Sequence, residues 1–277
     1  MSPNMPEAPV ISIIVPCFNY GHYLPDTLES VRAQDFTSWD CIVVDDGSSD
    51  DTASVCATFV ERDSRFRYIH QENSGLSAAR NAGLATARGR FIQLLDADDG
   101  LAKTKLSLQS AYLLAHPEAD LVYGDALFFS DDTGQLSDTR SDTAPGKAAL
   151  RKSACGAELL AMLCRDNIME VSCALFRTTL LQKAGIFDTA YKSYEDWHYW
   201  FRCALAGACF HYLPTEGTET HIRYGHASMM RQLRRMNSAG IQLRHFMEAH
   251  LEGRLARYNR YRLLKLSIKK IWLSLQR

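Results

Sequence analysis

The chain has 277 residues, of which 46% are hydrophobic and 23% are charged, and its formal net charge is −1. These values suit one large domain with a buried core, or one domain with a tail, and exclude a chain too polar to fold. No apolar stretch is long enough to span a bilayer, and residues 1–9 lack the pattern of a secretory signal, so we expect neither feature.

Short apolar runs alternate with helical patterns through the first half of the chain. Residues 1–9, polar and Pro-rich, are expected to be disordered. We predict strands at 10–15, 41–44, 66–71, 91–95 and 120–129. We predict helices at 24–34, from a cap at 49–51 to 62, at 76–87, and at 103–115, where Pro117 ends the last one.

This alternation predicts an α/β fold with a mostly parallel central sheet flanked by helices. The strands are continuously apolar, which is typical of a sheet covered on both faces. Ligands of such sheets bind at the carboxyl ends of the strands. Polar motifs that follow the strands are therefore the first candidates for a site.

The second half begins with a polar segment, 130–147, which we interpret as a loop or small hairpin. The predicted elements that follow are a helix at 157–165, a strand at 171–176, a helix ending at Gly185, an aromatic-rich helix at 194–206, and helices at 231–242 and 244–276.

The eight cysteines are scattered, without a Cys-x-x-Cys pair, and several lie in apolar runs such as 41–44. Free cysteine behaves as a small hydrophobic residue. We therefore expect buried, reduced thiols and a cytoplasmic protein.

Four polar motifs follow the first four predicted strands, so the strand-end rule places them on one rim of the sheet. They are Pro16-Cys17-Phe18-Asn19-Tyr20, Val44-Asp45-Asp46-Gly47-Ser48, the segment from Asn73 to Asn81, and Asp96-Ala97-Asp98-Asp99. Each alone could be a solvated turn that caps a helix. Four such motifs, each following one of four strands, indicate a ligand-binding site.

The residue types suit a nucleotide diphosphate. Asp96 and Asp98 are two residues apart, so in an extended segment they point to one side and can hold Mg²⁺ or Mn²⁺, which prefer hard oxygen ligands. Asp46 can accept a hydrogen bond from a base, and Phe18 offers an aromatic ring. Arg80 can meet phosphate or bind and orient Asp96.

With these motifs the sequence resembles glycosyltransferase family 2, which has the GT-A fold. The resemblance covers about 10–230 and implies a Rossmann-like nucleotide-sugar-binding half at 10–129 and an acceptor half at 148–230. Residues 231–277, beyond the resemblance, are predicted to form a basic helical tail. The resemblance also implies that the residue matching Asp46 contacts the base and that Asp96 and Asp98 handle ribose and metal. The nucleotide-sugar-binding residues expected on this basis are Pro16, Phe18, Asn19, Asp46, Gly75, Arg80, Asp96 and Ala97.

The acceptor half contains Glu195-Asp196-Trp197, which resembles the family's Glu-Asp-Trp segment, where an acidic residue is the general base. Inverting transfer needs a carboxylate to take the proton of the acceptor hydroxyl. We choose Asp196, with Glu195 as the substitute. The alternative is that both carboxylates only begin an amphipathic helix, where they suit the helix dipole.

Many family members carry Arg-x-His followed by Ser near this point, and that His can complete the metal shell. Here the matching segment is 220–228, with a spacing that departs by one residue. His226 is the better match to the metal ligand because Ser228 follows it, and His221 is the second choice. Either could equally be a surface residue.

The tail is strongly basic: 231–277 holds 12 Lys and Arg against 2 Asp and Glu, so it carries +10 and the remainder −11. Such a split suggests an anionic partner. One interpretation is a helix pair packed on the catalytic domain, or on a second subunit as a homodimer. The other is an interfacial helix on an anionic membrane, with Trp272 inserted. A nucleic-acid partner is not expected, because no recognised motif accompanies the charge.

We predict a metal-assisted enzyme that transfers a sugar from a nucleotide-sugar, with UDP the first choice of nucleotide, to a glycan or lipid-linked acceptor. A sugar nucleotidyltransferase would need a Gly-rich phosphate loop after the first strand, which 16–21 does not provide. A non-catalytic binding protein predicts loss of the acidic residues, yet Asp46, Asp96, Asp98 and Asp196 are present.

Overall fold

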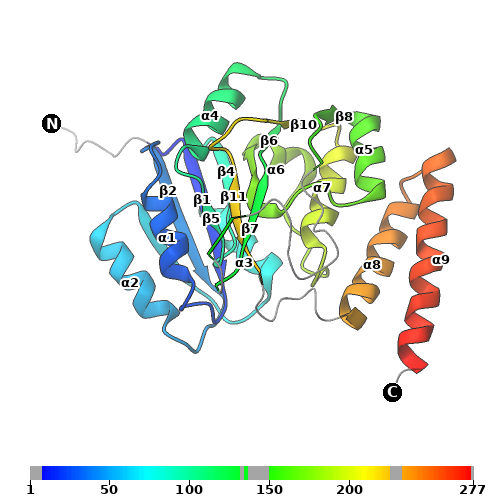
Figure 1. The fold of residues 1–277 in the computed structure, drawn as a ribbon, viewed down its shortest axis with the longest axis horizontal. Helices are drawn as coiled ribbons and strands as arrows, with labels where there is room; N and C mark the ends of the chain where they lie inside the picture. Colours follow the sequence, from blue (N-terminus) through cyan, green and yellow to red (C-terminus); the bar gives the residue numbers. More distant parts are fainter. Residues whose placement is uncertain (1–7, 132–133, 137–149, 225–232, 276–277) are drawn as a thin grey trace.

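The structure is a computed structural model that describes residues 8–131, 134–136, 150–224 and 233–275. The expected disordered segment 1–9 lies outside these residues apart from Ala8 and Pro9. Figure 1 shows a central sheet with helices on both sides, and a pair of helices, α8 and α9, at one edge of the molecule.

Within the described residues, eight strands form the main sheet in the order β3-β2-β1-β4-β9-β6-β10-β8. Their bounds are β1 Ile11–Cys17, β2 Trp39–Asp45, β3 Phe66–His70, β4 Phe91–Leu94, β6 Leu121–Tyr123, β8 Ala154–Cys155, β9 Ala174–Arg177 and β10 Cys209–Tyr212. Strands β3, β2, β1 and β4 pair in parallel, whereas β9 runs antiparallel to β4 and β6. The mostly parallel α/β sheet predicted from the sequence is confirmed.

A second sheet has the order β5-β11-β7, with β5 Gly100–Leu101, β7 Ala126–Phe129 and β11 Thr220–Arg223. The single strand expected at 120–129 was wrong, because its two halves, β6 and β7, belong to different sheets. The chain passes between them at Gly124, where a Cβ would lie 2.3 Å from the Thr218 carbonyl oxygen. Only glycine fits this close approach, so the strand divides there.

The helices cover both faces of the main sheet (Figure 1). Their bounds are α1 Leu24–Arg32, α2 Thr52–Arg62, α3 Leu76–Thr86, α4 Lys105–Ala115, α5 Gly156–Arg165, α6 Thr179–Ala184, α7 Glu195–Leu205, α8 Leu233–Glu248 and α9 Gly253–Leu275. Residues of α1, α2 and α4 share one core cluster with one side of the strands, and residues of α3, α5, α6 and α7 share another with the opposite side. The expected strand at 171–176 begins instead as a 3-10 turn, η1 Val171–Cys173.

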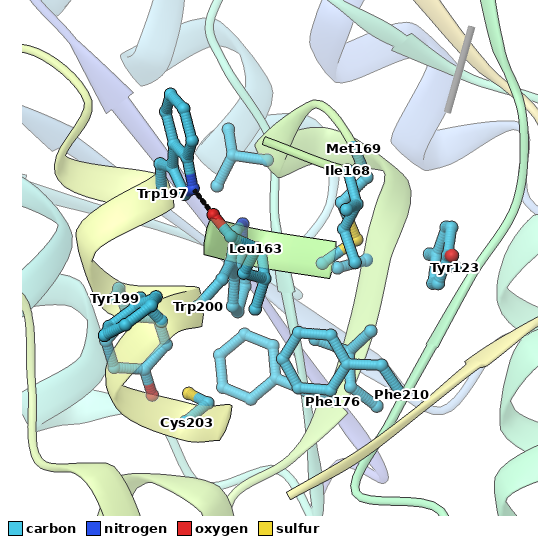
Figure 2. Packing of buried hydrophobic residues seen from close by; sticks show 14 of the residues in the cluster. Tyr123, Leu163, Ile168, Met169, Phe176, Trp197, Tyr199, Trp200, Cys203 and Phe210 are labelled. Atoms are coloured by element: carbon cyan, nitrogen blue, oxygen red, sulfur yellow. Dashed lines mark hydrogen bonds between the residues drawn. The ribbon is translucent and has the colours of Figure 1, made fainter. Parts of the chain in front are cut away.

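The aromatic run of α7 forms much of the second core. Trp197, Tyr199, Trp200 and Phe201 are all buried. Figure 2 shows Trp197, Tyr199 and Trp200 gathered with residues of β9 and α5, and the Trp197 indole Nε1 donates to the Leu163 carbonyl oxygen at 2.7 Å. This packing fixes the position of α7 and of the carboxylates at its start.

Helices α8 and α9 are antiparallel, and α8 packs against α7 (Figure 1). Phe246 lies edge-on to His198 of α7, and Asn259 in α9 donates to the backbone of Arg244 in α8. The break between the helices falls at 249–252, beyond the expected position near 243. Among the described residues, no helix is both long and apolar enough to cross a bilayer.

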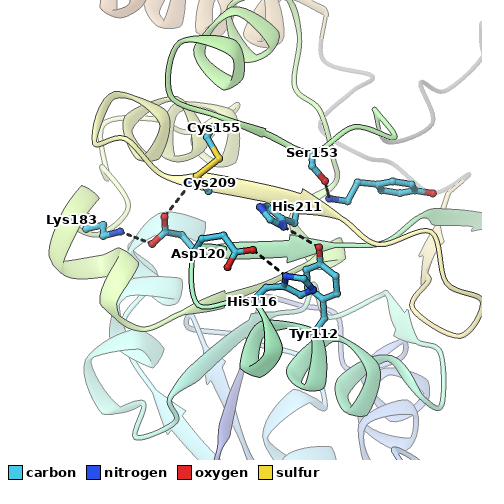
Figure 3. The surroundings of a disulfide bond; sticks show 10 residues. Tyr112, His116, Asp120, Ser153, Cys155, Lys183, Cys209 and His211 are labelled. Carbon is cyan, nitrogen blue, oxygen red and sulfur yellow. Dashed lines mark hydrogen bonds and ion pairs between the residues drawn. A yellow bond between two sulfur atoms is a disulfide. The ribbon is translucent and has the colours of Figure 1, made fainter.

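The expectation of reduced thiols was wrong for one pair. Cys155 and Cys209 form a disulfide between β8 and β10, which Figure 3 shows at the edge of the sheet. They come together because the two residues are direct partners in that antiparallel pair, a proximity that their separation of 54 residues hides in the sequence. The other six cysteines are free and buried, as expected.

Candidate active site

The polar motifs that follow β1 and β2 are joined at the rim of the sheet. The Asn19 backbone N–H donates to Ser48 Oγ at 2.9 Å, and Asn19 Oδ1 accepts from the Ser49 N–H at 2.8 Å. Asn19 has a φ of 56°, a left-handed conformation that asparagine tolerates. Beside it, Phe18 is 46% exposed, so its ring is open to a ligand, whereas Pro16 is buried inside β1.

The Asp46 carboxylate, at the end of β2, holds the loop after β3 by hydrogen bonds. Its Oδ1 accepts from Gln71 Nε2 at 2.6 Å and from the Ser74 N–H at 2.9 Å, and its Oδ2 accepts from the Gly75 N–H at 2.8 Å. Gly75 has a φ of 92°, which strongly favours glycine at this position. The buried carboxylate therefore shapes the loop that begins α3.

Arg80 of α3 connects Asp96, after β4, to Glu195 at the start of α7. Its side chain is 1% exposed, with Nη2 2.8 Å from Asp96 Oδ1 and Nη1 2.8 Å from Glu195 Oε1. Of the two arrangements that the sequence allowed for Arg80, the structure shows the pairing with Asp96. Burial and two carboxylate partners therefore already engage the charge of Arg80.

Asp96 and Asp98 are half-buried, and Ala97 between them is buried and accepts a hydrogen bond from Thr27 Oγ1 at its carbonyl. The extended geometry expected for this Asp-x-Asp segment was wrong: the segment is a turn, in which the Asp99 N–H donates to the Asp96 carbonyl at 3.1 Å. Asp99 is buried behind them and accepts from Ser172 Oγ at 2.8 Å. Burial, together with the Asp98 carboxylate, raises the pKa of Asp96 and Asp99.

This cluster suits a hydrated divalent cation. Three neighbouring carboxylates repel each other, and a cation held by Asp96 and Asp98 would relieve that repulsion. Mg²⁺ commonly takes one or two protein carboxylates and completes its shell with substrate phosphates and water. The part of the chain that the structure describes holds no group of three His, Cys, Asp or Glu residues able to bind a metal.

The sequence offered two candidates for the histidine metal ligand, His226 and His221. His226 lies outside the described residues. His221 lies on β11 opposite Gly100 of β5, and its Cβ is 3.8 Å from the position of a Cβ on Gly100. Burial lowers the pKa of His221.

Asp196 and Glu195 begin α7 but have different surroundings. Glu195 is buried in its ion pair with Arg80, whereas Asp196 is half-buried. Asp196 Oδ2 accepts from Asn167 Nδ2 at 2.7 Å, and Oδ1 accepts from the Trp197 N–H at 2.7 Å. Burial, with the neighbouring Glu195 charge, raises the pKa of Asp196 to about 7. A carboxylate with this pKa is suited to proton transfer near neutrality.

The residue before these carboxylates has an unusual backbone. Tyr194 has a φ of 59°, and Asn19 is the other non-glycine residue with positive φ among those described. A bulky side chain in this region is strained and persists where the surroundings hold it. Here α8 supplies support: Gly240 faces the Tyr194 ring, and Arg235 Nη2 donates to the Lys192 carbonyl at 2.9 Å.

Several residues that complete the site were not predicted from the sequence. Asn167 binds Asp196, and Ser172 Oγ joins Asp99 to the Asp96 N–H. Lys192 Nζ lies 3.3 Å from the Ser74 carbonyl and 3.1 Å from the position of a Cβ on Gly75. None of them belongs to one of the polar motifs, so only the tertiary contact reveals them.

Arg223 was also missed. Its Nε donates to the Asp98 carbonyl at 3.2 Å, its backbone N–H contacts Asp99, and its guanidinium pairs with Asp26 and Asp131. It therefore ties the loop that carries Asp98 to α1. The sequence did draw attention to this region, since Arg223 lies in the segment 220–228 that contains the candidate histidine ligands.

Comparisons with known proteins agree on one family. The family model for Glycosyl transferase family 2 matches residues 12–185. Glycosyltransferase GlyG of Streptococcus pneumoniae serotype 4 is 34% identical over 128 residues, which cover 46% of this chain and 42% of that protein. TuaG of Bacillus subtilis strain 168, whose name assigns it to teichuronic acid biosynthesis, is 36% identical over 126 residues, or 45% of this chain and 50% of that protein. Both matches thus span half of the relative or less.

Two solved structures share the fold. TarS 1–349 of S. aureus in complex with UDP-GlcNAc has a TM-score of 0.68 at 18% identity, covering 92% of this chain and 71% of that one. The mannosyltransferase PcManGT of Pyrobaculum calidifontis, in complex with GDP-Man and Mn²⁺, has a TM-score of 0.66 at 18% identity, covering 98% and 77%. At this identity the likeness shows the fold alone.

Proposed function

The chain belongs to glycosyltransferase family 2 and has the GT-A fold, and on that premise we propose that it is an inverting glycosyltransferase. It transfers a sugar, with a UDP-sugar as our first choice of donor, to a glycan or lipid-linked saccharide. The observation that carries the proposal is the chain of contacts from Asp96 through Arg80 to Glu195, the neighbour of Asp196. It links the donor carboxylates rigidly to the candidate base.

The donor is bound by the rim of β1 to β4. In this proposal Phe18 offers its exposed ring to the nucleobase, and Asp46 holds the Ser74–Gly75 loop against which the nucleoside lies. Structural neighbours bound to UDP-GlcNAc and GDP-Man support a nucleotide-sugar at this rim. They do not distinguish the base, since they differ in it.

Asp96 and Asp98 would hold Mn²⁺ or Mg²⁺, and the neighbour bound to Mn²⁺ supports this assignment. When bound, the cation would stabilise the negative charge of the departing nucleoside diphosphate. Ser172 binds the Asp96 backbone and the Asp99 carboxylate, and Arg80 binds the Asp96 carboxylate, so Asp96 is positioned before the donor arrives.

Lys192 is our candidate for direct contact with the donor phosphates. Its ammonium lies over the Ser74–Gly75 loop, close to where α3 begins, and its side chain is exposed. Arg80 cannot serve in this way because it is buried between two carboxylates. A lysine at the loop would add charge neutralisation that the acidic rim lacks.

Asp196 carries the proton transfer. Its carboxylate takes the proton of an acceptor hydroxyl while that oxygen attacks the anomeric carbon, and the bond from that carbon to the diphosphate oxygen breaks with inversion. Asn167 holds one carboxylate oxygen by its amide N–H. Glu195 is a poorer candidate, because its carboxylate is buried in an ion pair with Arg80, whereas the Asp196 carboxylate is half-buried and easier for an acceptor hydroxyl to reach.

The acceptor is expected to be a saccharide of the cell envelope. The relative named for teichuronic acid biosynthesis supports polysaccharide synthesis, and a lipid-linked saccharide would place the reaction at the cytoplasmic face of a membrane.

Nucleoside diphosphate release tests the function. Purified protein would be incubated with a panel of UDP-, dTDP- and GDP-sugars and Mn²⁺, with and without EDTA, beside Asp98→Ala. Asp188→Asn, at an exposed carboxylate away from the rim, is the matched control. Release from one donor that EDTA and Asp98→Ala abolish supports the proposal. Tight donor binding by calorimetry without release, even with lipid-linked acceptors, would favour a non-catalytic binding protein.

A further inference from the structure

Helix α9 has two apolar faces. One is buried against α8 and the catalytic domain and includes Ala256 and Leu273, with Leu266 against Gly240. The other, the apolar stripe of α9, consists of Tyr261, Leu264, Ile268, Ile271, Trp272 and Leu275, which are 53% to 78% exposed. No other described element exposes so many large apolar side chains.

The stripe lies on the side of α9 opposite the buried face. Ile268 and Leu264 are each two residues from Leu266, and Ile271 and Leu275 are each two residues from Leu273. Two residues correspond to about 200° around a helix. The stripe therefore cannot be reached by the helices that pack on α9, and exposed apolar patches of this kind mark interaction sites.

The charge of α9 indicates what covers the stripe. The helix holds seven basic residues and no acidic one: Arg254, Arg257, Arg260, Arg262, Lys265, Lys269 and Lys270. Lys265 and Lys269 are exposed beside the stripe. A second copy of α9 would bring two such helices together and repel, whereas a nucleic acid would leave the apolar stripe in water. An anionic lipid surface satisfies both features, because acyl chains receive the stripe and headgroups receive the lysines.

We propose that the apolar stripe of α9 is the surface by which this protein binds anionic membranes, with Trp272, Ile271 and Ile268 entering the interface. The opposite, buried face of α9 is connected to the candidate active site through α8. Leu266 lies against Gly240 and accepts at its carbonyl from Asn237, and Gly240 contacts Tyr194, next to the proposed base.

Vesicle binding by the 277-residue chain tests this inference. Wild type would be sedimented with vesicles of phosphatidylcholine alone and with an equal mixture of phosphatidylcholine and phosphatidylglycerol. The stripe variant is Ile271→Ser with Trp272→Ser, and the charge variant is Lys265→Gln with Lys269→Gln. The matched controls are Leu114→Ser and Ile186→Ser, which are 53% and 52% exposed on other surfaces, and Lys103→Gln. Circular dichroism would check that each variant folds.

We expect wild type to bind the mixed vesicles only. The stripe variant should bind at least about tenfold more weakly, since burial of large apolar side chains drives insertion. The charge variant should lose about fivefold per lysine, and added salt should reduce this difference. The controls should bind like wild type.

Equal binding by wild type and the stripe variant would overturn the inference, as would failure of wild type to bind the mixed vesicles. A dimer that the stripe variant abolishes, without vesicle binding, would assign the stripe to a second copy instead. The assay contains neither donor nor acceptor, so it succeeds or fails independently of the proposed transfer activity.

Discussion

Glu195 Oε1 and Arg80 Nη1 form a buried ion pair at 2.8 Å. This ion pair connects the N-terminus of α7 to α3. The same guanidinium holds Asp96, so one residue sets the distance between the donor carboxylates and the start of α7. The pair also separates two adjacent carboxylates into different roles. Glu195 is engaged, while Asp196 retains exposure and a raised pKa.

Substitutions in this pair should affect stability more than chemistry. Glu195→Gln keeps an acceptor for Arg80 and should lower the free energy of unfolding by about 1.5–3 kcal/mol, with turnover reduced less than about tenfold. Arg80→Leu leaves two carboxylates without a partner and should cost about 3–5 kcal/mol. Urea denaturation and turnover on one preparation would measure both. Loss of turnover in Glu195→Gln with unchanged stability would make Glu195 the base.

The pH profile should report Asp196. Its carboxylate accepts a proton only when ionised, so kcat/KM should rise with pH through about 7 and then level off. Asn167→Ala removes a hydrogen bond that favours the ionised form and should move this limb to higher pH. Initial rates from about pH 5 to about pH 9 would show it, with Asp188→Asn as the unchanged control. A profile without a limb in this range would remove Asp196 from the role of base.

Lys192→Gln should weaken donor binding through the phosphates. Loss of one ammonium near a diphosphate is expected to raise the Kd for UDP about tenfold at low salt and to leave the Kd for uridine unchanged. Isothermal calorimetry with both ligands would separate the two contributions, and Lys103→Gln is the matched surface control. An equal Kd for UDP in wild type and variant would place Lys192 outside the donor site.

The disulfide should stabilise the acceptor half. Cys155 and Cys209, separated by 54 residues, close a loop that contains α5, α6 and α7, and Cys155→Ser should lower the free energy of unfolding by about 2–4 kcal/mol. Dithiothreitol should lower the midpoint of wild type toward that of the variant and leave the variant unchanged. If the reductant shifts neither protein, the two thiols are not joined.

The sequence was sufficient for the alternating half of the fold. Continuous apolar strands such as Cys41–Val44 and the helices between them are local features, and they predicted the parallel strands β1 to β4 and the motifs at their ends. The strand at 120–129 was wrong because apolar character alone does not reveal where a chain changes sheets. Strands β5, β8, β10 and β11 were not predicted, since each is four residues or fewer and depends on partners far away in the sequence.

The candidate site was likewise predictable only where its residues lie in local sequence motifs. Motif residues such as Asp46, Arg80 and Asp96 could be placed on one rim because each follows a strand. Their supports could not: Asn167 and Ser172 reach the site from the acceptor half, and no spacing connects them to it. The sequence also could not show which of Glu195 and Asp196 is the better candidate base. The two differ because Glu195 is paired with the buried Arg80, a contact that only the tertiary structure reveals.

The most direct test of the central claim is turnover by Asp196→Asn, measured with donor affinity on the same sample. Asn167 has a buried Oδ1 that lacks a hydrogen-bond partner among the described residues, so its amide can turn to accept from the amide N–H that the substitution introduces, and the fold should persist. Because the folded state raises the pKa of Asp196, ionisation of this carboxylate costs stability as pH rises toward about 7, so the variant should be at least as stable as wild type above that pH.

We predict that Asp196→Asn binds the donor with a Kd within about twofold of wild type and transfers sugar at least about 100-fold more slowly. This result would support Asp196 as the base of a glycosyl transfer. Transfer at the wild-type rate by a folded, donor-binding variant would contradict it.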